Sequence, residues 1–187
     1  EATYVDGIAD GICDGEIIIT RTWSLTDVNG NAALDQVQTI TVEDNTAPTF
    51  TMPIDITIYK DADCLYDASV TETGDVTDEA DNCSVGEATY NDVIDASNPC
   101  SIEIIRTWSL TDDCGNAAVE QIQTITVEDN TAPTFTKPID ITIYKDADCL
   151  YDASVTETGD VTDEADNCSV GEATYTDVID ASNPCSI

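Results

Sequence analysis

The sequence predicts an all-β fold, made of tandem β-sandwich repeats of 85 residues. Residues 43–102 recur as residues 128–187 with only two changes, and similarity at a fixed period marks an array of repeats. Apolar and polar residues also alternate along several short segments, as they do in half-buried strands. No segment has the apolar spacing of a convincing amphipathic helix.

The repeat boundaries are read from a motif that occurs twice. Val-Glu-Asp-Asn-Thr-Ala-Pro-Thr-Phe occupies residues 42–50 and again residues 127–135. It carries turn formers and a proline between two β-rich segments, which is typical of a short linker. Residues 1–44 are then the C-terminal part of a first repeat, residues 45–129 a complete repeat, and residues 130–187 the N-terminal part of a third. We expect the chain to be a segment of a longer array.

The first three strands of the complete repeat are short. Phe50 to Ile58 alternates apolar and polar residues, and Pro53 within it favours an edge strand because proline donates no ladder hydrogen bond. Tyr66 to Val70 predicts a second strand, and Ala88 to Tyr90 a third.

The last two strands are longer. Ile102 to Leu110 places its apolar residues on one face, together with Arg106, which should need a carboxylate partner near the rim. Ile122 is out of phase with Ile125 and Val127, which predicts a bulge in the last strand. Short strands with turn signals at this spacing predict an immunoglobulin-like β-sandwich.

The charge of the chain excludes several functions. There are 39 acidic residues, five basic ones and no histidine, for a formal net charge of -34. Such a chain repels nucleic acid and anionic membranes, and it has no apolar run near the ~20 residues that span a bilayer. We therefore expect no nucleic-acid partner and no membrane insertion. The eight cysteines predict disulfides and an extracellular location.

An enzymatic role is not predicted. Without histidine the chain has no general base that titrates near neutral pH, and no nucleophile motif or phosphate-binding loop is present. Carboxylates crowd every loop, so a pair of them carries no information about glycoside hydrolysis. Trp23 and Trp108 alternate with apolar residues and should pack in the core.

Motifs along the complete repeat resemble the HYR (hyalin repeat) domain, an immunoglobulin-like module. They are Asp44 to Pro48, Pro53 to Thr57, Thr77-Asp78 with Asp81 to Cys83, Trp108 with Thr111-Asp112 and Cys114 to Asn116, and Thr124 to Asp129. The tandem form is similar to giant surface adhesins of Bacteroidota. This resemblance implies export by the type IX secretion system and, in some such adhesins, a role in gliding. Family members often carry a cysteine where this chain has Met52 and Lys137, so that crosslink is not expected.

Three disulfide pairings are open to the cysteines of the complete repeat. Cys114 is replaced by Asn29 in the first repeat, whereas Cys100 has a counterpart in Cys13. A Cys100–Cys114 bond would therefore leave Cys13 without its partner.

Topology narrows the pairings further. In an immunoglobulin-like fold the strands before Cys83 and Cys114 end at one pole, whereas Cys64 and Cys100 precede strands that start at the other. The predicted disulfides are Cys64–Cys100, Cys83–Cys114 and, by repeat equivalence, Cys149–Cys185. A covalent link between neighbouring repeats is the alternative.

Clumped acidic residues near the linkers predict a calcium site, since calcium takes six to eight oxygen ligands. The candidate ligands are Glu43, Asp44, Asn45, Asp75, Asp78, Asp81, Asp112, Asn116, Glu128, Asp129, Asp160, Asp163 and Asp166. The alternative is a solvated coat that keeps the array soluble, helped by the preference of turns for aspartate and asparagine.

These observations predict a structural segment of an extracellular filament or stalk of a cell-surface adhesin, linked to adhesion or gliding. Its partners would be neighbouring repeats of the same chain or filament. A multivalent module that binds carbohydrate, such as surface glycans, or protein is the alternative.

Overall fold

The computed structural model describes residues 1–98 and 101–179. By its contacts the chain forms two compact units. Unit 1 contains Glu1–Ile58 and Asp67–Glu128, and unit 2 contains Tyr59–Tyr66 and the chain from Asp129 onward. The complete repeat thus gives one of its loops, Tyr59–Tyr66, to the unit of the third repeat, so the units and the sequence repeats do not coincide.

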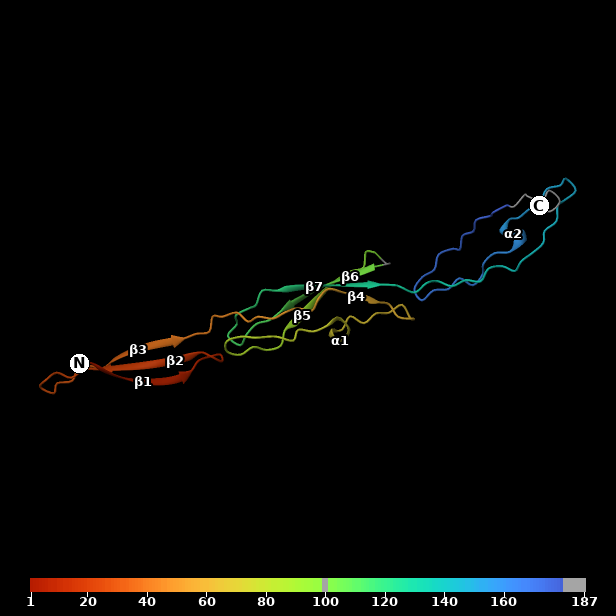
Figure 1. Ribbon diagram of the computed structural model, residues 1–187. Helices are drawn as coiled ribbons and strands as arrows, with labels where there is room; N and C mark the ends of the chain where they lie inside the picture. Colours follow the sequence, from red (N-terminus) through yellow and green to blue (C-terminus); the bar gives the residue numbers. More distant parts are fainter. Residues whose placement is uncertain (99–100, 180–187) are drawn as a thin grey trace. The chain divides into compact units, whose positions relative to one another are not determined.

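Unit 1 contains a three-stranded antiparallel sheet from the first repeat. Its strands are β1 (Thr3–Asp10), β2 (Ile17–Ser24) and β3 (Gln36–Val42), in that spatial order. Figure 1 shows the three arrows lying alongside one another. β2 is central and pairs with both neighbours along nearly its whole length.

A four-stranded sheet forms in the complete repeat, in the order β4-β7-β6-β5 (Figure 1). Its strands are β4 (Ile56–Tyr59), β5 (Thr89–Asp95), β6 (Ser101–Ser109) and β7 (Gln121–Glu128). Tyr90 faces Trp108 across β5 and β6, as Tyr4 faces Trp23 across β1 and β2. The sheet of the first repeat therefore repeats the β5-β6-β7 part of this sheet.

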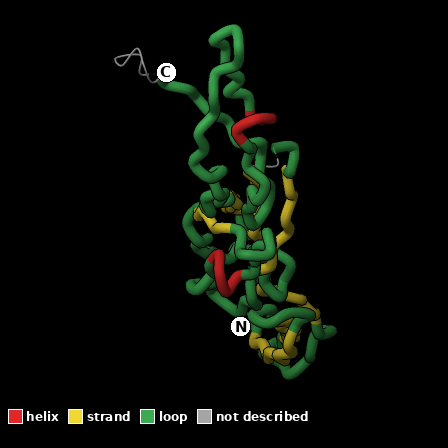
Figure 2. Tube along the Cα trace, turned by 90° about the vertical axis from the view of Figure 1, so that its right-hand side faces the viewer, coloured by secondary structure: helices red, strands yellow, loops and turns green. Residues whose placement is uncertain are grey.

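The all-β prediction is confirmed at this level. The helices of the described residues are single turns, α1 (Val70–Thr73) and α2 (Val155–Thr158), and none of them is long and apolar enough to cross a membrane. Figure 2 shows strands and these two short helices joined by long loops.

The strand predicted from Tyr66 to Val70 is wrong. Asp67 accepts a hydrogen bond from the backbone N–H of Ser69 at 2.8 Å, and the Ser69 carbonyl accepts from Thr73 at 3.0 Å. These turn contacts use backbone groups that a strand would need for its ladder, so the segment begins α1 instead. β4 is also shorter than predicted. It begins at Ile56, after Pro53, and lies at the edge of its sheet as that proline indicated.

The core of the complete repeat lies on one face of the four-stranded sheet. Phe50, Val76, Trp108 and Leu110 form the buried cluster, and Trp108 is fully buried, as predicted. Trp23, which was also predicted to pack in a core, is only half-buried. The segments that face the sheet carry isolated bridges such as Thr49↔Ala80.

Arg106 lies in this core with the carboxylate partner that the sequence called for. Its Nε and Nη2 atoms donate to the two Asp92 oxygens at 2.8 Å each. Nη1 donates to Thr73 at 2.7 Å and Nη2 also to the Ala68 carbonyl. The guanidinium carbon lies 4.0 Å from the Tyr90 ring centroid. Because all three guanidinium nitrogens donate hydrogen bonds and the group lies against the Tyr90 ring, its charge is tolerated at 1% side-chain exposure.

The bulge predicted at Ile122 is wrong. β6 and β7 pair without an extra residue, with Thr107 opposite Ile122 and Arg106 opposite Gln123. Gln123, not Ile122, takes the inward position, and Ile122 is 57% exposed. Gln123 Nε2 donates to the carbonyls of Ile54 and Thr73 at 3.0 and 2.8 Å. Its Oε1 accepts from the Trp108 indole at 3.3 Å, so every polar atom of this side chain is used.

Candidate functional site at the repeat junctions

Both disulfides of the described residues join consecutive sequence repeats. Cys13 of the first repeat bonds Cys114 of the complete repeat, with 5.1 Å between Cα atoms. Cys64 of the complete repeat bonds Cys168 of the third, with 4.9 Å between Cα atoms. The two cysteines of each bond are separated by 101 and 104 residues along the chain, respectively. If a disulfide acts by restricting the unfolded chain, a crosslink over such a span stabilises the folded state by about 4–5 kcal/mol.

The predicted pairing within each repeat is therefore wrong for Cys64 and Cys114. Cys83 and Cys149, predicted to be bonded, are free and exposed thiols, and Cys100 and Cys185 lie outside the described residues. The prediction assumed that the cysteines of each repeat form disulfides with one another. The alternative, a covalent link between neighbouring repeats, is what the structure contains.

A tight loop presents Cys64 to its partner. The backbone N–H of Asp61 donates to the Leu65 carbonyl at 2.8 Å, and that of Cys64 donates to the Asp61 carbonyl at 3.1 Å. Cys64 itself adopts a positive φ of 61°. The side-chain amide of Asn167, next to Cys168, donates to the Asp61 carbonyl at 2.8 Å. This contact was missed at the sequence level, and no local pattern in the chain signals it.

A second loop, of the first repeat, presents Cys13. The Gly11 N–H donates to the Glu16 carbonyl at 2.9 Å, and the Glu16 N–H to the Cys13 carbonyl at 3.2 Å. Gly15 has a φ of +90° and lies against Cys83, so that a β-carbon there would overlap the Cys83 sulfur. Glycine is therefore required both for the backbone conformation and for the approach of Cys83.

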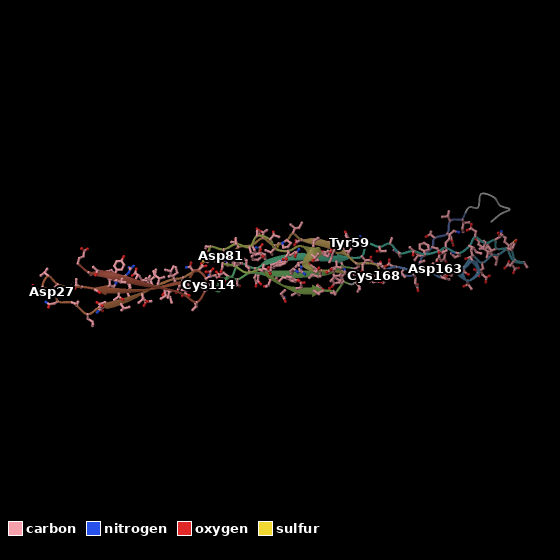
Figure 3. The ribbon with its side chains drawn as sticks, turned by 90° about the horizontal axis from the view of Figure 1, so that it is seen from below. Asp27, Tyr59, Asp81, Cys114, Asp163 and Cys168 are labelled. Atoms are coloured by element: carbon pink, nitrogen blue, oxygen red, sulfur yellow. A yellow bond between two sulfur atoms is a disulfide. The ribbon has the colours of Figure 1, made fainter. Side chains whose placement is uncertain are left out.

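The linker residue Asp44 joins the first and complete repeats by hydrogen bonds. Its carboxylate accepts from the Asn82 side chain at 3.1 Å and from the Thr46 backbone at 3.0 Å. Its carbonyl accepts from the Asn116 side chain at 3.1 Å. Figure 3 labels Asp81 and Cys114 in this region of unit 1. Asp44, Asn82 and Asn116 thus hold the same junction that the Cys13–Cys114 disulfide crosslinks.

One group of candidate metal ligands comes together at this junction. One oxygen each of Asp44 and Asp81 and the Cys83 sulfur lie within 4.8 Å of one another. Hydrogen bonds, first from the Thr46 backbone and then from Asn82, lower the pKa of the Asp44 carboxyl. Burial around the sulfur and then the Asp44 carboxylate raise the pKa of the Cys83 thiol, although the residue as a whole is exposed. The Cys83 thiol therefore stays protonated to a higher pH than an ordinary cysteine does.

Other predicted calcium ligands have structural hydrogen bonds of their own. Asp78 accepts from the backbone and hydroxyl of Thr51 at 2.9 and 2.8 Å, and Asp163 accepts from Thr136 at 3.1 Å. Asp112 is buried and accepts from the backbone and side chain of Asn116, each at 2.8 Å. Asp112 therefore holds its own turn, whereas Asp78 and Asp163 each join segments that are 27 residues apart along the chain.

The remaining candidates do not belong to the Asp44 group. The carboxylates of Asp75, Asp129 and Asp160 accept from backbone N–H groups one or two residues further on. Glu43, Asn45 and Glu128 are exposed, and Asp166 accepts from the Cys168 backbone at 3.2 Å. The structure thus unites two of the predicted carboxylates, with Asn116 bonded to the backbone of one of them.

Calcium binding at Asp44 and Asp81 stays a prediction with a direct measurement. A bound cation would offset the repulsion of the two carboxylates, so millimolar calcium should raise the melting temperature relative to chelator. Asp81→Asn should remove that increase, and Asp160→Asn, outside the group, should leave it. An unchanged melting temperature in the parent chain would leave the carboxylates as a solvated coat.

Comparison with protein-family models, with curated proteins and with solved structures finds no match for this chain. We therefore infer a function from the geometry of the junctions alone.

Proposed function

We propose that this chain is a structural segment of an extracellular filament or stalk of a cell-surface adhesin. In this proposal its repeats are immunoglobulin-like β-sandwiches of the HYR type. The observation that carries it is the pairing of Cys13 with Cys114 and of Cys64 with Cys168. Each disulfide joins consecutive repeats. Tension along the array is therefore carried by the disulfides at the junctions as well as by the peptide linkers.

Two further properties support an extracellular mechanical role. Disulfides persist in oxidising compartments, which include the cell surface. The net charge of -34 keeps long arrays apart by mutual repulsion at low salt. Adhesion or gliding would then be the task of the whole adhesin, to which this segment supplies length and strength.

A single-molecule pulling experiment tests the mechanical role. With both disulfides intact, the shortest covalent path runs through residues 1–13, 64–114 and 168–187. This path is about 80 residue steps, or about 280 Å fully extended, whereas the reduced chain extends to about 650 Å. We expect the extension at high force to increase more than twofold when a thiol reductant is added.

The matched control replaces all four bonded cysteines, Cys13, Cys64, Cys114 and Cys168, by serine. This variant should reach the full extension with or without reductant. If the parent chain also reached full extension without reductant, no covalent bond would carry load across the junctions, and the proposal would fail.

A further inference from the structure

The four-stranded sheet of the complete repeat has a face that its core does not use. Arg106 and Trp108 turn inward from β6 and are buried, so Ile105 and Thr107, which alternate with them, turn outward. Both are only partly buried, and Val93, opposite Ile105 on β5, is 61% exposed. Every strand of this sheet belongs to the complete repeat. The open outward face is therefore a property of the complete repeat by itself.

Most of this outward face is uncharged. Its side chains lie in rows across β5, β6 and β7, of which the first two are Asn91, Thr107 and Ile122, and Val93, Ile105 and Thr124. The third row contains Asp95 and Glu103 beside Thr126, and Asp55 borders the face where its carboxylate accepts from the Thr124 backbone at 2.8 Å. Antiparallel sheets that face water usually carry polar side chains on that face. The apolar side chains in the first two rows therefore indicate a surface that a partner covers.

The sheet of the first repeat has an outward face of the same kind. Its rows, across β1, β2 and β3, are Val5, Thr22 and Val37, then Gly7, Thr20 and Thr39, then Ala9, Ile18 and Thr41. Val5 and Val37 are 74% and 67% exposed. None of these rows contains a charged residue, since Ala9 and Ile18 take the positions of the two acidic residues in the third row of the complete repeat. The uncharged face therefore recurs in both sheets.

Charge decides which partner fits these faces. With a net charge of -34, the chain attracts a cationic partner to its carboxylate-rich loops and not to an uncharged sheet. Two copies of the chain repel each other wherever their carboxylates meet, and like charges in contact disfavour a complex. Two uncharged faces in contact avoid that repulsion. The charge of the chain and the absence of charge on the faces thus point to the same partner, a second copy of this chain.

We infer that copies of this chain associate side by side, with the outward faces of their sheets packed on each other. Stacked sheets lie about 10 Å apart, with their strands within about 30° of each other. Threonine, valine and isoleucine form pleated surfaces that pack well in this way. The exposed carboxylates of Asp55, Asp95 and Glu103 then lie at the margin of the contact, in water. This inference concerns assembly between chains and does not rest on the mechanical role proposed above.

The area of each face sets how tightly it binds. Strands lie about 4.8 Å apart and outward residues about 6.7 Å apart along a strand, so three rows on three strands cover about 300 Å². Two such faces in contact remove about 600 Å² from water, less than the roughly 1,000 Å² of a stable interface. Two pairs of faces remove about 1,200 Å², which reaches that size. One sheet alone should therefore bind weakly, and the two sheets of the chain should reinforce each other through multivalency.

Sedimentation velocity of the full chain tests the association. Its free thiols are first blocked with iodoacetamide, without reduction, so that no new disulfide joins the copies. We expect monomers at about 0.01 M salt, where charges act over about 30 Å, and reversible dimers at about 1 M salt, where they act over about 3 Å. The dimers should form at chain concentrations below about 1 mM.

Charge placed on the faces tests where the copies meet. Thr22→Glu and Thr107→Glu, made separately, each put a carboxylate on the central strand of one face. Each should weaken association about tenfold or more, because a negative charge then lies in the contact between two acidic chains. Thr22→Gln and Thr107→Gln have the same size without the charge and should associate nearly as the parent does. Thr77→Glu, in an exposed loop away from both sheets, is the matched control and should have little effect.

A photoreactive side chain reports the contact with the threonines of both faces unchanged. At about 1 M salt, Val93→benzoylphenylalanine should crosslink to peptides of β1–β3 or β5–β7 of the other copy, identified by mass spectrometry. A chain that stays monomeric up to about 1 mM at this salt would leave the faces to a different partner and overturn the inference. Crosslinks confined to the loops, or a loss of association with Thr77→Glu as large as with Thr107→Glu, would overturn it as well.

Discussion

Replacing Arg106 with alanine should lower the free energy of unfolding of the four-stranded sheet by about 3–5 kcal/mol, because it removes a large side chain that is only 1% exposed and leaves a cavity and unpaired polar groups in the core. The change also removes the donors to Thr73 and the Ala68 carbonyl and the contact with the Tyr90 ring. Urea denaturation followed by tryptophan fluorescence measures the loss, in a Trp23→Phe background so that Trp108 alone reports.

The chain contains its own control for this prediction. Arg21 makes the same paired contact with Asp6 in the first repeat, but with both side chains about a quarter exposed. Arg21→Ala should cost about 1 kcal/mol or less, since water replaces the partner at an exposed ion pair. Equal losses for Arg21→Ala and Arg106→Ala would show that burial does not set the strength of this cluster.

Replacing Gln123 with alanine should destabilise the complete repeat by about 3 kcal/mol. It leaves the Trp108 indole N–H and the Thr73 carbonyl without partners in a buried site, and it also removes the half-buried hydrogen bond to the Ile54 carbonyl. Unsatisfied buried groups cost about 1–3 kcal/mol each before relaxation. Near-UV circular dichroism of Trp108 during thermal unfolding checks the result.

Two control variants test whether Gln123→Ala loses stability because buried hydrogen bonds are lost. Gln38→Ala removes the equivalent bond to Trp23 at an exposed site and should cost about 1 kcal/mol or less. Gln123→Leu keeps the side-chain volume and removes the polar atoms. A Gln123→Leu variant as stable as the parent would mean that the inward glutamine matters for packing and not for its hydrogen bonds.

Part of the fold was predictable because its signals are local. The alternation from Ile102 to Leu110 identified β6 and the inward Arg106, and a buried arginine requires a carboxylate. The same reasoning failed at Ile122, because it assumed that isoleucine turns inward. Gln123 does so instead, since three distant groups are placed to bond its amide. Such groups are visible only once the chain has folded.

The candidate site was less predictable than the fold. The sequence singled out the cysteines and the acidic linkers, and the structure brings Asp44, Asp81 and Cys83 together. The sequence could not show that the carboxylates of Asp78 and Asp112 already accept hydrogen bonds from Thr51 and Asn116. Hydrogen bonds to particular backbone groups depend on loop conformation, which composition does not reveal.

The sequence by itself determined the 85-residue period, the β-rich character, the acidic surface and the residues that can form disulfides. Only the tertiary structure decided which cysteines meet. A disulfide requires Cα atoms about 4.4–6.8 Å apart, and residues 101 and 104 positions apart along the chain satisfy this at 5.1 and 4.9 Å. Repetition makes a bond within a repeat and a bond between repeats look alike in the sequence, and folded distances alone tell them apart.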